Sequence, residues 1–139
     1  MHVREIMTSN VTAITPETSL KEAAEKMRDL NLGSLPVEEN GKVVGMLTDR
    51  DLTCRAVANG YDPATTPARE IMSRDVTFCY EDQDIDDVAH LMEEKHIYRL
   101  PVVSKEEKLA GILSISDLAQ HAPQELTGEV FRAVSQHIH

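Results

Sequence analysis

The sequence has few aromatic side chains and few basic ones relative to acidic ones. It contains no tryptophan, two phenylalanines and three tyrosines in 139 residues. Bases of single-stranded nucleic acid stack on aromatic side chains, so this composition offers few stacking platforms. Only 14 Lys and Arg stand against 24 Asp and Glu, which leaves a net charge of −10. Because nucleic acids and anionic membranes bind clustered basic residues, we expect neither as a partner.

The chain also lacks long hydrophobic runs. No stretch approaches the roughly 20 apolar residues that a membrane-spanning helix needs. The first residues, Met1-His2-Val3-Arg4-Glu5, do not form the apolar stretch of a signal peptide. We therefore expect a cytoplasmic protein.

The two cysteines, Cys54 and Cys79, lack the CxxC spacing typical of redox dithiols and zinc sites. We predict that both are buried free thiols and that the protein has no metal site. No nucleophile motif surrounds Cys54, and no repeated carboxylate pair suggests acid–base chemistry. With no catalytic apparatus visible, we expect a protein that is not an enzyme.

An internal repeat organises the sequence. When the chain is shifted by 65 positions against itself, Arg4-Glu5-Ile6-Met7 coincides with Arg69-Glu70-Ile71-Met72, and 11 identities fall between residues 3 and 37. One extra residue within 104–108 changes the shift to 66, after which Asp51-Leu52 coincides with Asp117-Leu118. Such self-similarity indicates two structurally equivalent copies. We predict one module with a first repeat and linker at 1–66, a second repeat at 67–123 and a helical tail at 124–139.

Each copy shows the same order of predicted elements. In the first copy, residues 11–14 form a short β-rich run, and apolar residues at helical spacing follow from Leu20 to Met27. Strands are predicted at 35–38 and 42–47, joined by the turn-forming dipeptide Asn40-Gly41. A second helix is predicted to begin near Asp49. The fold class is therefore α/β, with two β-α-β-β-α repeats that we expect to pack as a sandwich about a pseudo-twofold axis.

Polar residues at the predicted helix starts suggest capping boxes. Ser19 with Glu22 fits this pattern in the first copy, and Asp84 with Asp87 occupies the same positions in the second. Two further tetrads, at 48–51 and 114–117, each follow a glycine-bearing apolar strand and have the [ST]-x-x-[DE] spacing of a capping box. The same geometry offers backbone N–H groups to a phosphate and a carboxylate to a ribose. The two roles can coexist, so the spacing leaves both open.

The paired pattern of Leu-Pro-Val before a hairpin and Gly-x-x-[Thr/Ser]-x-x-Asp-Leu after it resembles the tandem cystathionine-β-synthase (CBS) domain, or Bateman module. The resemblance covers residues 3 to about 120. It implies that the clefts between the two copies bind an adenosine-bearing ligand: AMP, ADP or ATP, with NAD and S-adenosylmethionine as alternatives, and no required cofactor. It also implies a homodimer. Asp51 and Asp117 would each hold a ribose, beside Thr48 and Ser114.

The resemblance implies unequal clefts. The family places a phosphate-binding basic residue just before the Leu-Pro-Val strand, where this chain has Arg99 in the second copy and Ser34 in the first. By the resemblance, Arg99 serves the Asp51 cleft, and Arg50 can add a second charge there. The residues alone also allow Arg99 to be a solvated side chain paired with a carboxylate. The candidate ligand-binding residues are Ser34, Pro36, Thr48, Arg50, Asp51, Tyr98, Arg99, Pro101, Ser114, Ser116 and Asp117.

Two functions remain open for such a chain. The first is a regulatory, signal-transducing module that senses an adenine nucleotide and acts on an unidentified effector protein. The alternative is a structural or dimerisation module with vestigial clefts. Apolar residues at helical spacing near the C-terminus suit either core packing or a dimer contact; they are Leu126, Val130, Val134 and Ile138.

Overall fold

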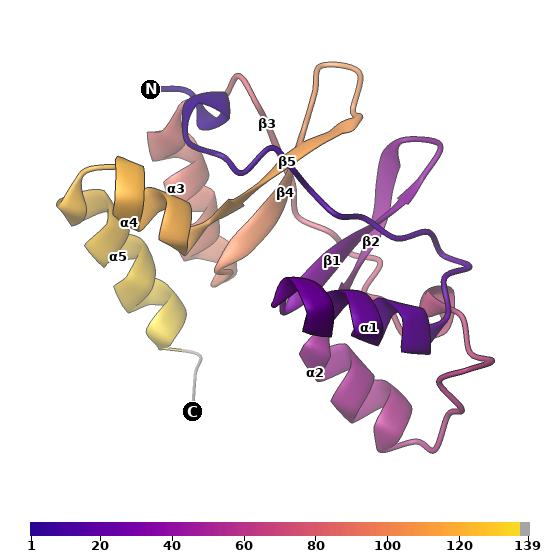
Figure 1. Ribbon diagram of the computed structural model, residues 1–139. Helices are drawn as coiled ribbons and strands as arrows, with labels where there is room; N and C mark the ends of the chain where they lie inside the picture. Colours follow the sequence, from indigo (N-terminus) through magenta and orange to yellow (C-terminus); the bar gives the residue numbers. More distant parts are fainter. Residues whose placement is uncertain (137–139) are drawn as a thin grey trace. The chain divides into compact units, whose positions relative to one another are not determined.

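The computed structural model describes residues 1–136 of the chain, which divide into two compact units (Figure 1). One unit is Thr12–Val76. The other consists of Met1–Val11 and the chain from Thr77 onward. Each unit has its own small sheet and its own hydrophobic core. The mixed α/β fold class predicted from the sequence is confirmed.

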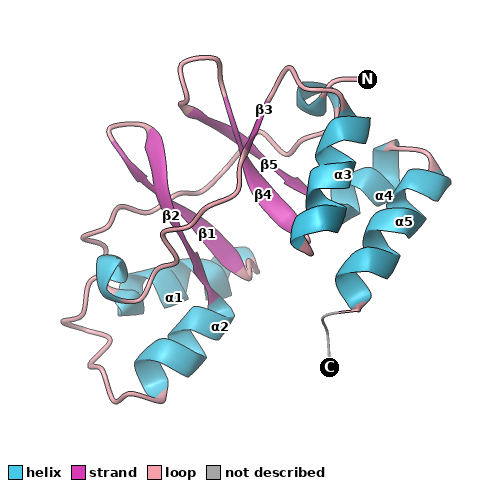
Figure 2. Cartoon of the chain, turned by 180° about the vertical axis from the view of Figure 1, so that it is seen from behind, coloured by secondary structure: helices cyan, strands magenta, loops and turns pink. Residues whose placement is uncertain are grey.

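The unit of Thr12–Val76 contains a two-stranded antiparallel sheet with helices against it (Figure 2). In chain order its elements are α1 (Leu20–Leu30), β1 (Ser34–Glu39), β2 (Lys42–Thr48) and α2 (Asp49–Asp51). Helix α2 continues as a π-helix over Leu52–Val57, and a 3₁₀ turn forms at Ala68–Glu70. The predicted helix near Asp49 is therefore confirmed, with a wider winding than an α-helix.

The second unit repeats this order and adds a helix. Its elements are β3 (Cys79–Tyr80), α3 (Ile85–Lys95), β4 (Arg99–Val103), β5 (Leu109–Ser114), α4 (Ile115–His121) and α5 (Gln124–Ser135). A 3₁₀ turn at Val3–Glu5 belongs to the same unit. In the sheet, β4 pairs parallel to β3 and antiparallel to β5.

The predicted first strand at 11–14 is wrong for most of its length. Only Ile14 pairs, in a single parallel bridge to Val37, whereas the equivalent β3 has two paired residues. In the second unit the parallel ladder continues because the backbone N–H of Glu81 donates to Val103 O at 3.0 Å. The residue at the equivalent position in the first repeat is Pro16, which has no N–H to donate.

The helix starts agree with the sequence, but the reciprocal capping boxes predicted at α1 and α3 are wrong. Ser19 accepts a hydrogen bond from the backbone N–H of Glu22, without the return bond from the Ser19 N–H to the Glu22 carboxylate that a capping box requires. At α3, Asp84 accepts from the N–H of Asp86 instead. One cap bond satisfies an otherwise unpaired N–H at each helix start.

The hairpin turn is as the sequence predicts. Asn40 and Gly41 both have positive φ, 57° and 83°, as a two-residue turn between twisted antiparallel strands requires. The longer connection 104–108 closes with a hydrogen bond from Ser104 N to Lys108 O at 2.8 Å. The extra residue of the second repeat is thus contained in a turn.

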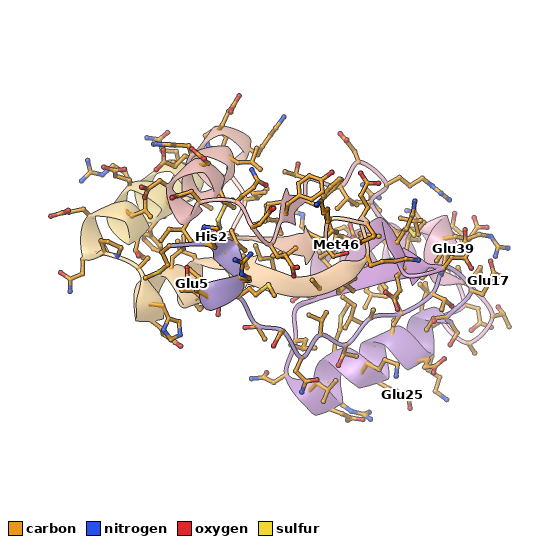
Figure 3. All side chains as sticks on the ribbon, turned by 90° about the horizontal axis from the view of Figure 1, so that it is seen from above. His2, Glu5, Glu17, Glu25, Glu39 and Met46 are labelled. Atoms are coloured by element: carbon orange, nitrogen blue, oxygen red, sulfur yellow. The ribbon has the colours of Figure 1, made fainter. Side chains whose placement is uncertain are left out.

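The residues that begin each repeat, 1–11 and 66–76, pack on the other repeat; we call them the lead segments. Thr8 exchanges two backbone hydrogen bonds of 2.9 Å with Ile112 of β5, and Ser73 does the same with Met46 of β2. At the start of the first lead segment, His2 N donates to a carboxylate oxygen of Glu5; both residues are labelled in Figure 3. His2 also forms an isolated antiparallel bridge with Asp84. Each compact unit therefore contains the lead segment of the other repeat.

The lead segments contribute buried residues to the two cores. Val3 and Ile6 pack into the core of the second unit, and the equivalent Ala68 and Ile71 pack into that of Thr12–Val76. Because buried apolar surface is the main stabilising contribution, each unit depends on a segment that lies outside its own repeat.

The C-terminal apolar residues are used inside the second unit. Val130 and Val134 of α5 are buried in its core, and Leu126 packs against it. His96, at the end of α3, also contacts α5, with Nδ1 3.0 Å from Ala133 O. Core packing is thus confirmed for these positions, while Ile138 lies outside the described residues.

The prediction that both cysteines are buried is wrong for one of them. Cys79 lies in β3 within the core, whereas Cys54 is exposed on the π-helix. Burial raises the pKa of the Cys79 thiol to about 12, because the thiolate is poorly solvated in the core. The two thiols therefore differ in access, Cys54 being exposed and Cys79 buried.

We expect a disulfide reagent to modify Cys54 rapidly in the native protein and Cys79 only after unfolding, since the attacking species is the thiolate. Ellman's reagent with and without guanidinium measures this. The Cys54→Ser variant should lose the fast phase entirely. Two fast thiols in the native wild type would contradict the placement of Cys79.

Among the residues that the structure describes, no helix is both long and apolar enough to cross a membrane.

Candidate functional site

The carboxylate of Asp51 is held at the start of α2 by a reciprocal capping box. Thr48 Oγ1 accepts from the Asp51 backbone N–H at 3.0 Å, and the Thr48 N–H donates to Asp51 Oδ2 at 3.0 Å. Asp51 is only 9% exposed. The capping interpretation of this tetrad is confirmed, and it fixes the orientation of a charged, nearly buried side chain.

The second oxygen of Asp51 faces an arginine. Arg55 Nε lies 3.7 Å from Asp51 Oδ1, and the same guanidinium donates to the backbone carbonyl of Ile71 at 3.1 Å. The arginine thus links the helix that carries Asp51 to the lead segment packed in this unit. It partly neutralises the carboxylate without a short hydrogen bond to it.

Asp117 has the same capping box at the start of α4. Ser114 N–H and Oγ donate to Asp117 Oδ2 at 2.9 and 3.1 Å, and Ser114 Oγ accepts from the Asp117 N–H at 3.3 Å. Thr8 Oγ1 donates to the other oxygen, Oδ1, at 3.1 Å. Asp117 therefore accepts three hydrogen bonds here, while Asp51 accepts one and has an ion-pair partner.

The backbone donors at the start of α2 are already used. The N–H of Asp49 donates to Gly33 O at 3.0 Å, that of Arg50 to Asp49 Oδ1 at 2.8 Å, and that of Asp51 to Thr48. The sequence left open that this helix start presents N–H groups to a phosphate. This helix start therefore has no free N–H among its first three residues.

Ser34 and Arg99, which the sequence predicts to precede their strands, are the first residues of β1 and β4 and lie opposite the helix caps of their own units. Ser34 pairs with Thr48 across β1 and β2, and Arg99 pairs with Ser114 across β4 and β5. Directly opposed residues in an antiparallel pair project to the same face of the sheet. The structure therefore brings Arg99 beside the Ser114 cap within one unit.

The remaining predicted residues fall into two groups. Pro36 and Pro101 are buried within β1 and β4, and Tyr98 contributes its carbonyl, which accepts from the Ile115 N–H at 2.8 Å. Arg50 and Ser116 are exposed on their helices. The side chains of the two prolines are therefore covered, whereas those of Arg50 and Ser116 are exposed to solvent.

The sequence interpretation missed Thr8 and Arg55. Arg55 is four residues after Asp51, a spacing that predicts an ion pair on one helix face. Thr8 coincides with Ser73 in the repeat alignment, so a hydroxyl at this position in both copies was a visible signal. Its partner was not visible, because the packing of each lead segment on the opposite repeat cannot be read from the alignment.

Comparison with known proteins identifies the family. The family model described as "CBS domain" matches residues 3–56 and 68–123. The chain therefore belongs to the CBS-domain family, as a tandem pair. The CBS domain-containing protein YhcV of Bacillus subtilis is 37% identical over 139 residues, which cover 99% of this chain and 98% of that protein.

Solved structures of CBS pairs share the fold. Hypoxic Response Protein I, solved with two coordinated zinc ions, has a TM-score of 0.80 and 34% identity, covering 88% of this chain and 100% of that one. CBSX2 in complex with AMP has a TM-score of 0.75 and 26% identity, covering 87% and 95%. The CBS pair of MJ0100, in complex with 5′-methylthioadenosine and S-adenosylmethionine, has a TM-score of 0.74 and 30% identity, covering 86% and 98%.

Proposed function

We propose that this CBS pair is a non-catalytic regulatory module that binds an adenosine-containing ligand, with Asp51 and Asp117 as acceptors for the ribose hydroxyls. The observation that carries the proposal is the pair of capping boxes, which hold a carboxylate in the same orientation in both repeats. The complexes of CBSX2 with AMP and of MJ0100 with two adenosine derivatives support this ligand class.

The two carboxylates differ in how much hydrogen-bonding capacity they retain. A carboxylate has about four lone-pair positions. Asp117 uses three of them on Ser114 and Thr8, whereas Asp51 uses one on Thr48 and has Arg55 at ion-pair distance. A ribose with two free hydroxyls needs two positions. We therefore expect the Asp51 site to be the tighter one.

Since the helix start of α2 has no free N–H among its first three, arginines are the candidates for the phosphate. Arg50 is exposed beside Asp51. Arg99 is assigned to the Asp51 site by the family resemblance, although the strand register places it opposite Ser114 in its own unit. This assignment stays a prediction. A double-mutant cycle distinguishes coupling of Arg99 to Asp51 from coupling to Asp117.

We expect AMP, ADP or ATP to raise the melting temperature of the wild type and Asp51→Asn to abolish most of that shift. Ligand at 100 times its Kd adds about 2.7 kcal/mol of stability. The asparagine keeps an oxygen for the Thr48 N–H but loses one ribose acceptor, so affinity should fall roughly tenfold to a hundredfold. Asp49→Asn, two residues earlier and exposed, is the matched control and should bind like the wild type.

A thermal-shift panel that includes NAD and S-adenosylmethionine, followed by calorimetric titration, makes the measurement. If no adenosine compound shifts the transition, the scaffold alternative replaces this proposal. If ligands bind and Asp51→Asn has no effect, the site is wrong. Titration of Arg99→Ala alone, with Asp51→Asn and with Asp117→Asn tests the phosphate assignment, which requires coupling to Asp51 rather than to Asp117.

A further inference from the structure

The two oxygens of Asp117 differ in how far their hydrogen-bonding capacity is already used. Oδ2 accepts from both the N–H and the hydroxyl of Ser114, at 2.9 and 3.1 Å. A carboxylate oxygen has about two lone-pair positions, so these two bonds saturate Oδ2. Oδ1 accepts from Thr8 Oγ1 at 3.1 Å. The capacity that remains on Asp117 therefore lies on the oxygen that Thr8 already contacts.

Asp51 keeps more of its capacity within the part of the chain that the structure describes. Its Oδ2 accepts a single hydrogen bond, from the Thr48 N–H at 3.0 Å. Arg55 Nε lies 3.7 Å from Oδ1, which is too long for a hydrogen bond, so this ion pair does not occupy a lone pair of Oδ1. Asp51 can therefore accept from both adjacent hydroxyls of a ribose.

The difference between the two carboxylates comes from the lead segments. Thr8 and Ser73 are equivalent in the repeat alignment, and each exchanges two backbone hydrogen bonds of 2.9 Å with the neighbouring strand. The backbone thus holds both residues in the same way. Of these two hydroxyls, only that of Thr8 bonds to an aspartate among the described residues, whereas Asp51 has Arg55 as its partner.

A ligand hydroxyl that binds Asp117 through the position of Thr8 has to replace Thr8 as the donor. Thr8 is exposed, so its displaced hydroxyl can turn to water, and the loss is one hydrogen bond to a charged group. Such a bond changes an equilibrium constant by about tenfold to a hundredfold. The second hydroxyl of a ribose therefore gains little at Asp117, because it exchanges one donor for another, while at Asp51 it adds a new hydrogen bond.

We infer that Thr8 determines the sugar specificity of the Asp117 site, which binds ribose and deoxyribose nucleotides almost equally, while the Asp51 site favours ribose. A site that hydrogen-bonds a ligand hydroxyl rejects the analogue without it, because the acceptor then has no partner. Thr8 supplies that partner at Asp117 from within the chain. The inference rests on the proposed function, since it concerns how the same two carboxylates bind a ribose.

Titration of the full chain with AMP and with deoxy-AMP, which lacks one of the two ribose hydroxyls, tests this specificity. Proton–nitrogen correlation NMR measures the two sites separately, through the amides of residues 114–117 and 48–51. In the wild type, the dissociation constant for deoxy-AMP should exceed that for AMP by about tenfold or more at 48–51, and by less than about threefold at 114–117. Thr8→Val should raise the ratio at 114–117 to about tenfold and leave the ratio at 48–51 unchanged.

Two variants control for the change of side chain. Thr8→Ser keeps the hydroxyl and should keep the wild-type ratio at 114–117. Ser73→Val makes the equivalent change in the other lead segment and should alter neither ratio. Thr8→Ala is a second variant without the hydroxyl, and it should act as Thr8→Val does. Both should stay folded, because Thr8 is exposed and its bridge to Ile112 uses backbone atoms alone.

The outcomes separate this inference from the proposed function. An unchanged ratio at 114–117 in both Thr8→Val and Thr8→Ala overturns the inference and leaves the proposed function standing. Loss of AMP binding at 114–117 in these variants also overturns it, because Thr8 would then be a direct ligand contact. If AMP binds at neither site of the wild type, the proposed function fails and the inference fails with it.

Discussion

Replacing Val3 with aspartate is expected to unfold the unit that contains the second repeat and to leave Thr12–Val76 folded. Val3 is fully buried in the core of that unit, where its backbone N–H donates to Gln83 O at 2.9 Å. An unpaired carboxylate there costs about 4 kcal/mol or more, a large part of the 5–15 kcal/mol that stabilises a typical domain. The effect should appear far along the chain from the substitution.

Hydrogen exchange followed by mass spectrometry distinguishes the two units. Peptides from residues 77–136 should lose protection in Val3→Asp, and Cys79 should become reactive to thiol reagents. Arg4→Asp introduces the same side chain one position later, on the exposed side of the turn, and should change little. Ala68→Asp, at the equivalent buried position, should destabilise residues 12–76 instead.

The opposite pattern would refute the packing of each lead segment on the other repeat. If Val3→Asp removed protection from residues 12–76 and spared 77–136, the first eleven residues would have to pack on their own repeat. Such an outcome would also remove the contact between Thr8 and Asp117, and with it the expected difference in affinity between the two carboxylates.

Local features of this fold could be predicted from the sequence because they depend on neighbouring residues. The periodicity from Leu20 to Met27 gives α1, the dipeptide Asn40-Gly41 gives the hairpin, and the spacing of Thr48 and Asp51 gives the cap. In each case the residues that determine the geometry lie within one or two turns of each other. The repeat alignment then transfers most of these elements to the second copy.

The packing of each lead segment on the other repeat could not be predicted, because it depends on contacts between residues that are far apart in sequence. Arg4-Glu5-Ile6-Met7 and its repeat form only short 3₁₀ turns followed by single bridges, which leave no periodic pattern. Both copies have equivalent acceptor strands, so the alignment is equally consistent with packing on either one. The sequence therefore predicted the motif but not the unit that it stabilises.

The candidate site also combines local contacts, which the sequence predicts, with a contact between distant residues, which it does not. The cap partners of Asp51 and Asp117 were predictable, as they lie three residues away. Thr8, which sets the remaining capacity of Asp117, comes from 109 residues earlier in the chain. The asymmetry between the two sites thus depends on tertiary packing more than on the motif itself.

Gly111→Ala is expected to detach the first lead segment from β5. A Cβ at Gly111 would lie 2.7 Å from Thr8 O and 2.8 Å from Met7 Sδ. The sulfur can move, but Thr8 O accepts a hydrogen bond from Ile112 N, so relief of the clash breaks that bridge. Overpacking of this kind costs about 1–3 kcal/mol.

The melting temperature should therefore fall by several degrees in Gly111→Ala, and the amides of Thr8 and Ile112 should exchange faster while residues 12–76 keep their protection. The double variant with Met7→Ala tests the cause, since it removes the sulfur contact and leaves the carbonyl in place. Rescue by Met7→Ala would mean that the thioether alone sets the close approach. If the double variant stays destabilised, the Thr8 carbonyl sets the close approach. The equivalent Gly45, where an added Cβ would lie 2.9 Å from Ser73 O, should then behave in the same way in the other unit.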